Sequence, residues 1–298
     1  MSSFLLLLIC LGLGVLFARS GRLPRDAPAV INTWIIDLAL PALVMELLPK
    51  LDFRLDVWYL ALSPWLVFIG SWLLFDRIGR RLHWSRGRIG AVVLTCGLGN
   101  TAFMGYPLIE ALRGREAMGL AVLGDQLGTF IVLSTGAVVA AAIYAGREPH
   151  PRAIVRRVLT FPPFIGLVIG LIAAAAGGWP PIVDEVLTRL GSTLTPLALF
   201  SVGLQFQLGF GSGQRAPLVL GLGWKLMLAP LLVWLVGVPL GIRGLPLTVS
   251  VLEAAMAPMV SAGILAGQFG LDPKLANSIV GVGTLVSLLS VPLAHLLL

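Results

Sequence analysis

Charged residues, cysteines and histidines are all scarce in this sequence, and each shortage excludes a class of protein. Charged residues make up 12% of the 298 residues, whereas a soluble globular domain averages about 25%. The two cysteines and three histidines are scattered, so they predict neither a disulfide framework nor a metal-ligand cluster. The hydrolase patterns G-x-S-x-G and H-E-x-x-H do not occur. We therefore expect no enzyme activity, no cofactor and no metal.

The sequence is rich in apolar residues, which occur in long segments. The chain is 57% hydrophobic, with a mean hydropathy of +0.96, and a helix needs about 20 apolar residues to cross a bilayer. Ten segments approach this length: about 3–18, 29–48, 57–75, 89–111, 117–143, 158–176, 183–207, 216–236, 246–269 and 274–297. The sequence thus predicts an all-α integral membrane protein with ten transmembrane helices.

The first segment has an alternative interpretation as a secretory signal peptide. Such peptides carry positive charge before their apolar stretch. Here no Lys or Arg precedes residues 3–18, and Arg19, Arg22 and Arg25 follow them. The segment also has a counterpart about 155 positions later in the chain. We therefore interpret it as a retained transmembrane helix.

The loop charges predict an orientation in the membrane. When the loops are numbered in chain order, the odd loops hold 14 Lys and Arg residues, and the even loops with the adjoining helix ends hold 6. Cytoplasmic loops of membrane proteins are rich in Lys and Arg, so the odd loops are expected in the cytoplasm and both termini outside the cell membrane. The net charge of +7 is explained in the same way, and we expect no nucleic-acid partner.

The chain also contains an internal repeat. "LALPALVM" at 38–45 is similar to "TLTPLALF" at 193–200, and their prolines, Pro41 and Pro196, are 155 positions apart. Pro107 in the fourth segment and Pro258 in the ninth are 151 positions apart. Each half, 1–143 and 153–298, would then hold five spans. An odd number of spans per half inverts the second half in the membrane, which is typical of secondary transporters.

Two of the predicted spans contain residues that interrupt helices. "GLGNTAFMGYP" at 97–107 carries three glycines, Asn100 and Pro107 within an apolar run. Interrupted helices in inverted-repeat transporters flank a substrate site near the middle of the membrane, and free N–H groups at a helix start attract an anion. We expect the unwound link just before Pro107 and a second half-helix starting at Pro258. The predicted substrate site comprises Asn100, Thr101, Gly105, Tyr106, Pro107, Ala257, Pro258, Met259 and Ser261.

Four further polar residues are candidates for a gate or for coupling to an ion. Asp125 and Gln126 lie about nine residues into the fifth span and Lys225 about nine residues into the eighth, while Gln205 ends the seventh. An ionisable side chain at that depth faces a cavity or a partner. The alternatives are an interfacial carboxylate for Asp125, a lysine that snorkels to water for Lys225 and a helix–helix hydrogen bond for Gln205. Glu253, near the start of the ninth span, is interpreted as solvated at the interface.

Several motifs, taken together, resemble one known family. They are "GNTAFMGYPL" at 99–108, "PLALFSVGLQF" at 196–206, "WKLMLAPLL" at 224–232 and "AMAPMVSAGILAGQFGLDPKLANSIVGVGTLVSLLSVPL" at 255–293. In order and spacing they are similar to those of the auxin efflux carriers, also called PIN-like carriers. The resemblance extends over nearly the whole chain.

The resemblance implies a single transporter unit over 1–298, in which helices four and nine cross at their prolines. Helices at about 3–48 and 158–207 would form a scaffold, and helices at about 57–143 and 216–297 a transport domain that moves like an elevator. Family members are typically homodimers that carry organic anions, and bacterial relatives are often carboxylate permeases. Plant hormone carriers have an asparagine beside each crossing proline, whereas here Leu108 and Met259 follow the prolines, which argues against auxin as the substrate.

Three functions fit these observations. The first is a permease for a small organic anion, expected to be a carboxylate, in a lipid bilayer. The second is a cation/proton antiporter or sodium-coupled symporter, which would need a buried acidic cluster. The third is a membrane sensor or enzyme, which does not need two interrupted helices in mirrored positions.

Overall fold

The computed structural model describes residues 2–24, 26–51, 57–206 and 214–296. The named elements among these residues are all helices, with no named strand. Five of the described helices are long and apolar enough to cross a membrane, or six when the bent pair α10 (Pro151–Leu159) and α11 (Pro162–Ala175) counts as one. The remaining predicted spans correspond to shorter or interrupted helices. The membrane-protein class is confirmed, and the count of ten spans stays a prediction.

The described residues form two compact units, which we describe separately. Unit 1 takes its residues from 1–54, 102–122 and 156–206. Its helices are α1 (Ser2–Ser20), α2 (Ala27–Trp34), α3 (Leu40–Leu47), α6 (Tyr106–Arg113), α11, α12 (Pro181–Gly191) and α13 (Leu194–Leu204). A π-helical turn, η1 (Ile35–Ala39), joins α2 to α3, and short 3-10 turns lie at η2 (Leu48–Lys50) and η4 (Arg115–Ala117).

Helices α1 and α13 of unit 1 approach each other closely through two glycines. A Cβ atom added to Gly14 would lie 2.3 Å from the carbonyl oxygen of Phe200, and one added to Gly203 would lie 2.3 Å from that of Leu11. Any side chain at these positions would therefore overlap the backbone of the opposite helix. Small residues allow this kind of backbone contact between helices in membranes.

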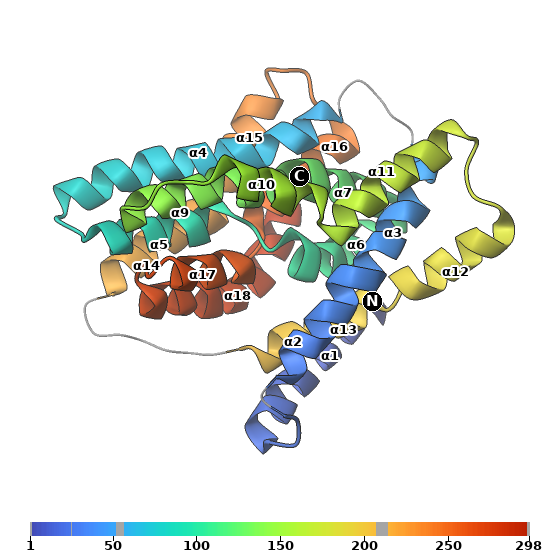
Figure 1. Ribbon diagram of the computed structural model, residues 1–298, viewed down its shortest axis with the longest axis horizontal. Helices are drawn as coiled ribbons and strands as arrows, with labels where there is room; N and C mark the ends of the chain where they lie inside the picture. The colour runs from blue at the N-terminus through green and yellow to red at the C-terminus, as the bar shows by residue number, and fades with distance from the viewer. Residues whose placement is uncertain (1, 25, 52–56, 207–213, 297–298) are drawn as a thin grey trace. The chain divides into compact units, whose positions relative to one another are not determined.

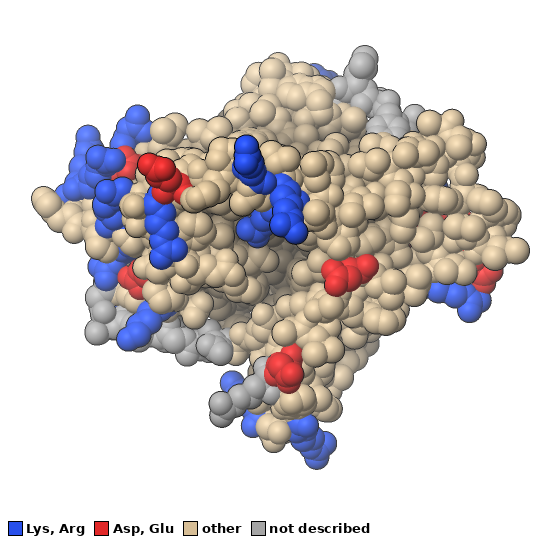
Figure 2. All heavy atoms as spheres, viewed as in Figure 1, with Lys and Arg blue, Asp and Glu red and all other residues tan. Residues whose placement is uncertain are grey.

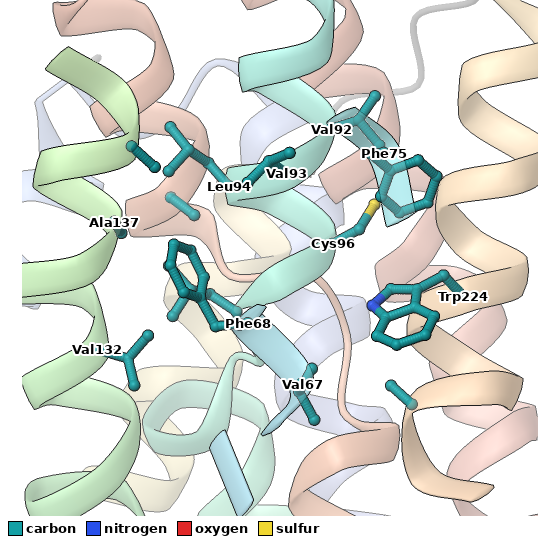
Figure 3. Packing of buried hydrophobic residues seen from close by; sticks show 14 of the residues in the cluster. Val67, Phe68, Phe75, Val92, Val93, Leu94, Cys96, Val132, Ala137 and Trp224 are labelled. Atoms are coloured by element: carbon teal, nitrogen blue, oxygen red, sulfur yellow. The ribbon is translucent and has the colours of Figure 1, made fainter. Parts of the chain in front are cut away.

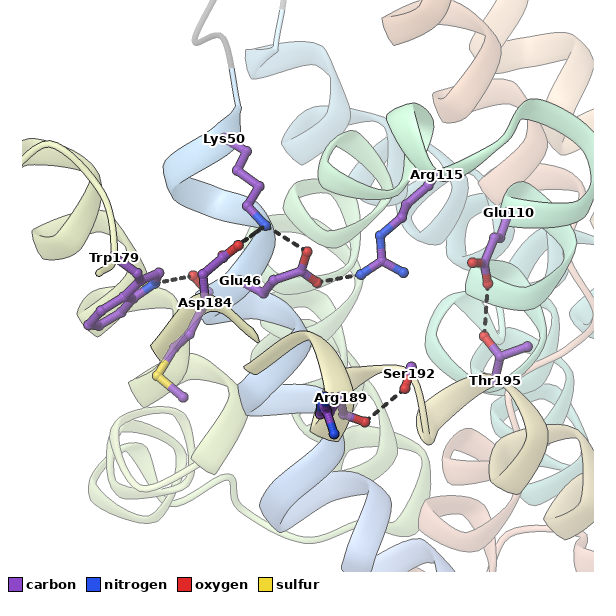
Figure 4. Close-up of polar contacts among 10 residues, drawn as sticks. Glu46, Lys50, Glu110, Arg115, Trp179, Asp184, Arg189, Ser192 and Thr195 are labelled. Atoms are coloured by element: carbon purple, nitrogen blue, oxygen red, sulfur yellow. Dashed lines mark hydrogen bonds and ion pairs between the residues drawn. The ribbon is translucent and has the colours of Figure 1, made fainter. Parts of the chain in front are cut away.

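A polar network ties together one end of unit 1 (Figure 4). The buried carboxylate of Glu46 pairs with Lys50 at 2.9 Å and with Arg115 at 2.7 Å. Lys50 also pairs with Asp184 at 2.8 Å, and Trp179 donates to the carbonyl of Met45 at 2.7 Å. The network joins parts of the predicted second, fourth and sixth loops, so three even-numbered loops lie at the same end of this unit.

Unit 2 takes its residues from 55–101, 123–155 and 207–298. Its helices are α4 (Trp58–Arg81), α5 (Arg86–Gly97), α8 (Phe130–Val132), α9 (Val138–Ala145), α14 (Arg215–Gly223), α15 (Ala229–Gly237), α16 (Gly244–Ala255), α17 (Val260–Gln268) and α18 (Pro273–Leu296). π-helical turns interrupt them at η5 (Gly124–Thr129), η6 (Leu133–Ala137) and η7 (Trp224–Leu228). The turn η3 (Thr101–Gly105), α7 (Met118–Leu123) and α10 run across the boundary between the units.

The core of unit 2 surrounds α5, which is buried along most of its length (Figure 3). Phe68 from α4, Val132 from α8 and Trp224 from η7 belong to the same buried cluster as the residues of α5. A Cβ atom on Gly97 would lie 2.8 Å from the ring of Phe68, and one on Gly221 would lie 2.7 Å from the sulfur of Cys96. Cys96 thus serves as a small apolar residue, as its place in an apolar run predicts.

Three odd-numbered loops meet at one end of unit 2, beyond the ends of α4 and α9 at the left of Figure 1, and Figure 2 shows basic side chains gathered there. Arg86 donates to the carbonyl of Ile143 at 2.6 Å, and Arg88 pairs with Asp272 at 3.4 Å. The guanidinium of Arg147 lies 5.7 Å from the centre of the Phe269 ring. The grouping matches the alternation of loops inferred from the sequence, while the side of the membrane stays a prediction.

Candidate functional site

Two helices of unit 2 end abruptly in extended segments. Helix α5 ends at Gly97, and Leu98 after it has φ −122° and ψ 133°. Helix α16 ends at Ala255, and Met256 after it has φ −60° and ψ 156°. These breaks, at 98–100 and 256–259, lie in the fourth and ninth predicted spans. The interruptions that the sequence predicts are therefore present.

The two breaks pair with each other through their backbones. Gly99 and Pro258 form an isolated antiparallel bridge. The N–H of Asn100 donates to the carbonyl of Ala257 at 2.8 Å, and that of Met259 donates to the carbonyl of Leu98 at 3.1 Å. Unpaired backbone groups are costly in an apolar interior. The pairing thus compensates part of the hydrogen bonding lost where the helices stop.

Residue types at the breaks suit this close approach. A Cβ atom on Gly99 would lie 2.9 Å from the carbonyl oxygen of Glu253. Pro258 has no N–H and therefore adds no donor to satisfy. A Cβ atom on Gly283 of α18 would lie 2.4 Å from the Pro258 ring. Gly99, Pro258 and Gly283 consequently leave little room for larger side chains around the pairing.

The positions of the breaks differ from the sequence-based expectation. The link lies at 98–100 and not just before Pro107, because the chain re-enters helix through the π-helical turn η3 and continues into α6. Pro107 stands in the first turn of α6. Pro258 lies in the extended segment, two residues before α17 begins at Val260. The predicted helix start at Pro258 is therefore wrong, since the pairing with Gly99 keeps this proline extended.

The predicted substrate-site residues are divided between the units. Gly105, Tyr106 and Pro107 belong to unit 1, where Tyr106 and Pro107 are buried. Unit 2 holds the remaining six, and there Asn100, Thr101, Ala257 and Pro258 are buried while Met259 and Ser261 are half-buried. The meeting of Pro107 with Pro258 at one point stays a prediction.

Asp125 and Gln126 lie beside the first break. The hydroxyl of Thr101 donates to Asp125 Oδ1, and Gln126 Nε2 donates to Asp125 Oδ2 at 2.7 Å. Asp125 is 4% exposed and Gln126 is fully buried, so both side chains face protein partners and not solvent, while the depth of Asp125 in the membrane stays a prediction. Both carboxylate oxygens are bonded, which anchors η5 to the residue that follows the break.

Lys225 is fully buried in η7, so the expectation that it snorkels to water is wrong. Its ammonium group donates to the carbonyl of Ala254. The side chain of Glu253 interacts electrostatically with Lys225 and with Asp125. Glu253 is only 3% exposed, which contradicts its interpretation as solvated at the interface. Lys225 lies in a π-helical turn, and such turns are frequent at functional sites.

The carboxylate of Glu253 has an unusual environment. Neither of its oxygens accepts a hydrogen bond from the residues that the structure describes. A Cβ atom on Gly124 would lie 2.2 Å from Glu253 Oε2. The carboxylate thus fits against Gly124, directly beside Asp125. Sequence reasoning left Glu253 out of the site because its contacts come from residues far along the chain.

A small cavity in unit 2 adjoins these groups. Its volume is about 10 Å³, which is near the room needed for one water molecule. It is lined by Ser63, Pro64, Val67, Gly97, Leu98, Gly99, Thr129, Lys225, Glu253 and Ala254. The break after α5, the buried ammonium and the buried carboxylate therefore border one space.

Gln205, the remaining candidate, belongs to unit 1 and has a local role. Its amide donates to the carbonyl of Ser201 at 3.2 Å and to the hydroxyl of Ser201 at 3.0 Å. That hydroxyl donates to Asn32 at 2.6 Å, linking α13 with α2. These bonds correspond to the helix–helix alternative that the sequence left open. They do not place Gln205 with Asp125, Gln126 and Lys225.

Comparison with known proteins identifies the family. Residues 1–295 match the family described as "Membrane transport protein". The chain belongs to this family of PIN-like carriers. The predicted resemblance is thereby confirmed, and the chain is an integral membrane protein of a transporter family.

Three relatives extend over nearly the whole chain. An uncharacterized transporter of Methanothermobacter thermautotrophicus is 27% identical, with 96% of this chain and 94% of the relative covered. An uncharacterized transporter of Methanocaldococcus jannaschii is 24% identical, with 98% and 97% covered. A putative malonate transporter of Rhizobium meliloti is 29% identical, with 94% and 89% covered.

Proposed function

We propose that this membrane transporter is a secondary carrier of a small organic anion, and that the anion is a carboxylate. The observation that carries the proposal is the pair of backbone-linked breaks at 98–100 and 256–259, bordered by the buried ammonium group of Lys225. Non-helical backbone at membrane depth is tolerated where it faces protein or a water-filled cavity. Substrate sites of secondary transporters lie at such breaks.

Positive charge favours an anion at this position. Lys225 lines the cavity beside the first break, and an ammonium group in an apolar interior needs a compensating negative charge. The start of α17 follows the second break and adds the partial positive charge of free N–H groups. The relative from Rhizobium meliloti is named a putative malonate transporter, which supports a dicarboxylate as the first substrate to test.

The proposed architecture is ten transmembrane helices in two inverted repeats, 1–143 and 153–298, with helices four and nine crossing at their breaks. The proposed scaffold, about 3–48 and 158–207, overlaps unit 1, and the proposed transport domain, about 57–143 and 216–297, overlaps unit 2 except at 102–122. Because the cavity holds about one water molecule, a carboxylate enters only after neighbouring segments separate. We propose that an elevator-type movement opens this space alternately to each side.

The proposed setting is the cell membrane, with both termini outside and two copies of the chain joined through their scaffold helices. Figure 2 shows few charged side chains over much of the visible face. Large exposed side chains such as Leu16, Val30 and Ile172 lie on unit 1. Surface of this kind suits lipid or a second copy.

A cation/proton antiporter or sodium-coupled symporter is the second candidate, and one observation favours it. Such a carrier needs a buried acidic cluster, and Asp125 and Glu253 are buried and interact electrostatically. The adjacent Lys225 adds a positive charge to this acidic pair. Because that charge disfavours a bound cation, the support for the antiporter is weaker than the support for the anion carrier.

Reconstituted protein tests both candidates. Purified protein in proteoliposomes is supplied with a panel of labelled carboxylates including malonate, with and without a pH or sodium gradient. The anion proposal expects saturable uptake of at least one carboxylate above that of empty liposomes. Cation-dependent flux with no uptake of any carboxylate would instead support the antiporter.

A further inference from the structure

Glu253 and Asp125 are neighbouring buried carboxylates with different hydrogen bonding. Asp125 accepts bonds from Thr101 and Gln126, one at each oxygen. Glu253, at 3% exposure, accepts none from the described residues and lines the cavity. Donors to a carboxylate stabilise its ionised form, and burial without donors disfavours it. If the two groups share one proton, that proton therefore belongs on Glu253.

The charge of Lys225 makes the binding of an anion depend on whether Glu253 is protonated. Its ammonium group interacts electrostatically with Glu253, and also with Cys96 of α5. Asp125 from η5 and Lys225 from η7 are the charged groups that influence Glu253 electrostatically. When Glu253 is ionised, it neutralises Lys225 and repels an incoming anion. When Glu253 is protonated, the positive charge of Lys225 is available to the anion.

We propose that Glu253 is the proton-binding residue of this carrier and that it couples anion entry to proton entry. This inference rests on the proposed function and specifies its driving ion. One proton adds to the Glu253 carboxylate as one carboxylate substrate enters beside Lys225. Both are released when the site opens to the opposite side, and no other bond forms or breaks. The carrier is then an anion–proton symporter.

The coupling has a quantitative consequence. Binding of the anion and of the proton assist each other to the same degree, because linkage is reciprocal. Where Glu253 is mostly ionised in the free protein and one proton is taken up with the anion, the affinity for the anion falls by up to about tenfold for each unit that the pH rises. A carrier without this coupling shows flat affinity over a range in which the substrate itself does not titrate.

The first test uses the unmodified protein with malonate as the probe. Malonate is added to purified protein in weakly buffered solution between about pH 7 and 9, where carboxylates are ionised, and proton uptake and affinity are recorded together. The proposal expects proton uptake approaching one per bound malonate and affinity that falls as the pH rises. Malonate binding with no proton uptake anywhere in this range would overturn it.

The second test assigns the proton to Glu253. In Glu253→Gln the proton uptake on malonate binding and the pH dependence of affinity should disappear, and a pH gradient should no longer drive malonate accumulation. Glu253→Asp keeps a titratable carboxyl on a shorter side chain and should retain proton uptake with a shifted pH dependence. If the Gln variant does not fold, an unchanged pH dependence in Glu253→Asp would overturn the assignment. The matched control is Glu185→Gln in α12, whose side chain is 62% exposed and pairs with Arg189; it should behave like the unmodified protein.

The outcomes separate the two proposals. If the unmodified protein transports none of the carboxylates, the proposed function fails. If it transports malonate and Glu253→Gln still takes up a proton with the original pH dependence, the function stands and the assignment to Glu253 is overturned.

Discussion

Single polar residues connect the breaks of unit 2 to the helices around them. Thr101 follows the first break and bonds Asp125, while Lys225 bonds the carbonyl of Ala254 just before the second. In an apolar interior, a donor removed from a buried carboxylate leaves that group insufficiently solvated. Substitutions at these positions therefore affect the geometry of the breaks as well as local stability.

Thr101→Val should reduce carboxylate uptake strongly, by roughly tenfold, and destabilise the protein by about 1.5–3 kcal/mol, the typical worth of a hydrogen bond to a charged group. The substitution keeps the shape of the side chain but removes the donor to Asp125. Thr135→Val is the matched control, because the Thr135 hydroxyl bonds only the carbonyl of Ile131 in its own helix among the contacts described. Initial uptake rates and thermal unfolding of both variants give the comparison, and equal effects would contradict a special role for Thr101.

Pairs of elements are held together where glycines let backbones approach. The clearest contacts are those of Gly14 with Gly203 in unit 1 and of Gly99 with Glu253 and Lys225 in unit 2. At both places an added methyl group meets backbone that cannot move without shifting a helix or a break. Overpacking of this kind typically costs about 1–3 kcal/mol.

Gly99→Ala should separate the paired breaks and lower carboxylate uptake to near background. Its Cβ atom would lie 2.9 Å from the Glu253 carbonyl oxygen and 3.2 Å from Lys225 Nζ. Gly223→Ala in α14 is the control, because nothing lies within 4 Å of the added atom. Uptake assays on the two variants at equal protein amounts test the expectation, and full activity in Gly99→Ala would show that the pairing is dispensable.

Gly14→Ala should destabilise the α1–α13 contact, with a cost of about 1–3 kcal/mol. The added atom would lie 2.3 Å from the Phe200 carbonyl oxygen, whereas one on Gly12, two residues earlier in the same helix, meets nothing within 4 Å. Thermal unfolding in detergent should show a lower midpoint for Gly14→Ala than for Gly12→Ala. Indistinguishable midpoints would mean that α1 and α13 adjust freely.

The whole molecule combines an apolar body with charged loops whose grouping follows the predicted alternation. Odd loops meet at one end of unit 2 through Arg86, Arg88 and Arg147, and even loops meet at one end of unit 1 through Glu46, Lys50 and Arg115. The positive-inside rule predicts that the odd loops face the cytoplasm. Only measurement on the chain in a membrane tests that orientation.

Labelling of single cysteines from one side of the membrane tests the orientation. The chain has two cysteines, Cys10 and Cys96, so a background without them needs only two substitutions. In this background, His83→Cys in the third loop should react with an impermeant thiol reagent only after the membrane is opened. Ile182→Cys, at a position 78% exposed in the sixth loop region, should react in intact cells. The reverse pattern would invert the predicted topology.

Local sequence features predict much of this protein because they act within one helix. Long apolar runs give the spans, and the glycines, Asn100 and Pro258 mark the two places where helices stop. Family membership follows from motifs along the whole length. The position of the first break was misplaced by several residues, since η3 lets the chain resume helical structure well before Pro107.

The sequence by itself determined that the chain is a membrane protein of this transporter family with two interrupted spans, because hydropathy and helix breakers are properties of neighbouring residues. The tertiary structure alone decided that Gly99 pairs with Pro258 and that Lys225 and Glu253 are buried side by side. Those outcomes depend on contacts between residues more than a hundred positions apart, or between separate helices. The local sequence around a charged residue in an apolar run is the same whether its side chain reaches water or a buried partner. Only the packing of the helices decides between these two environments.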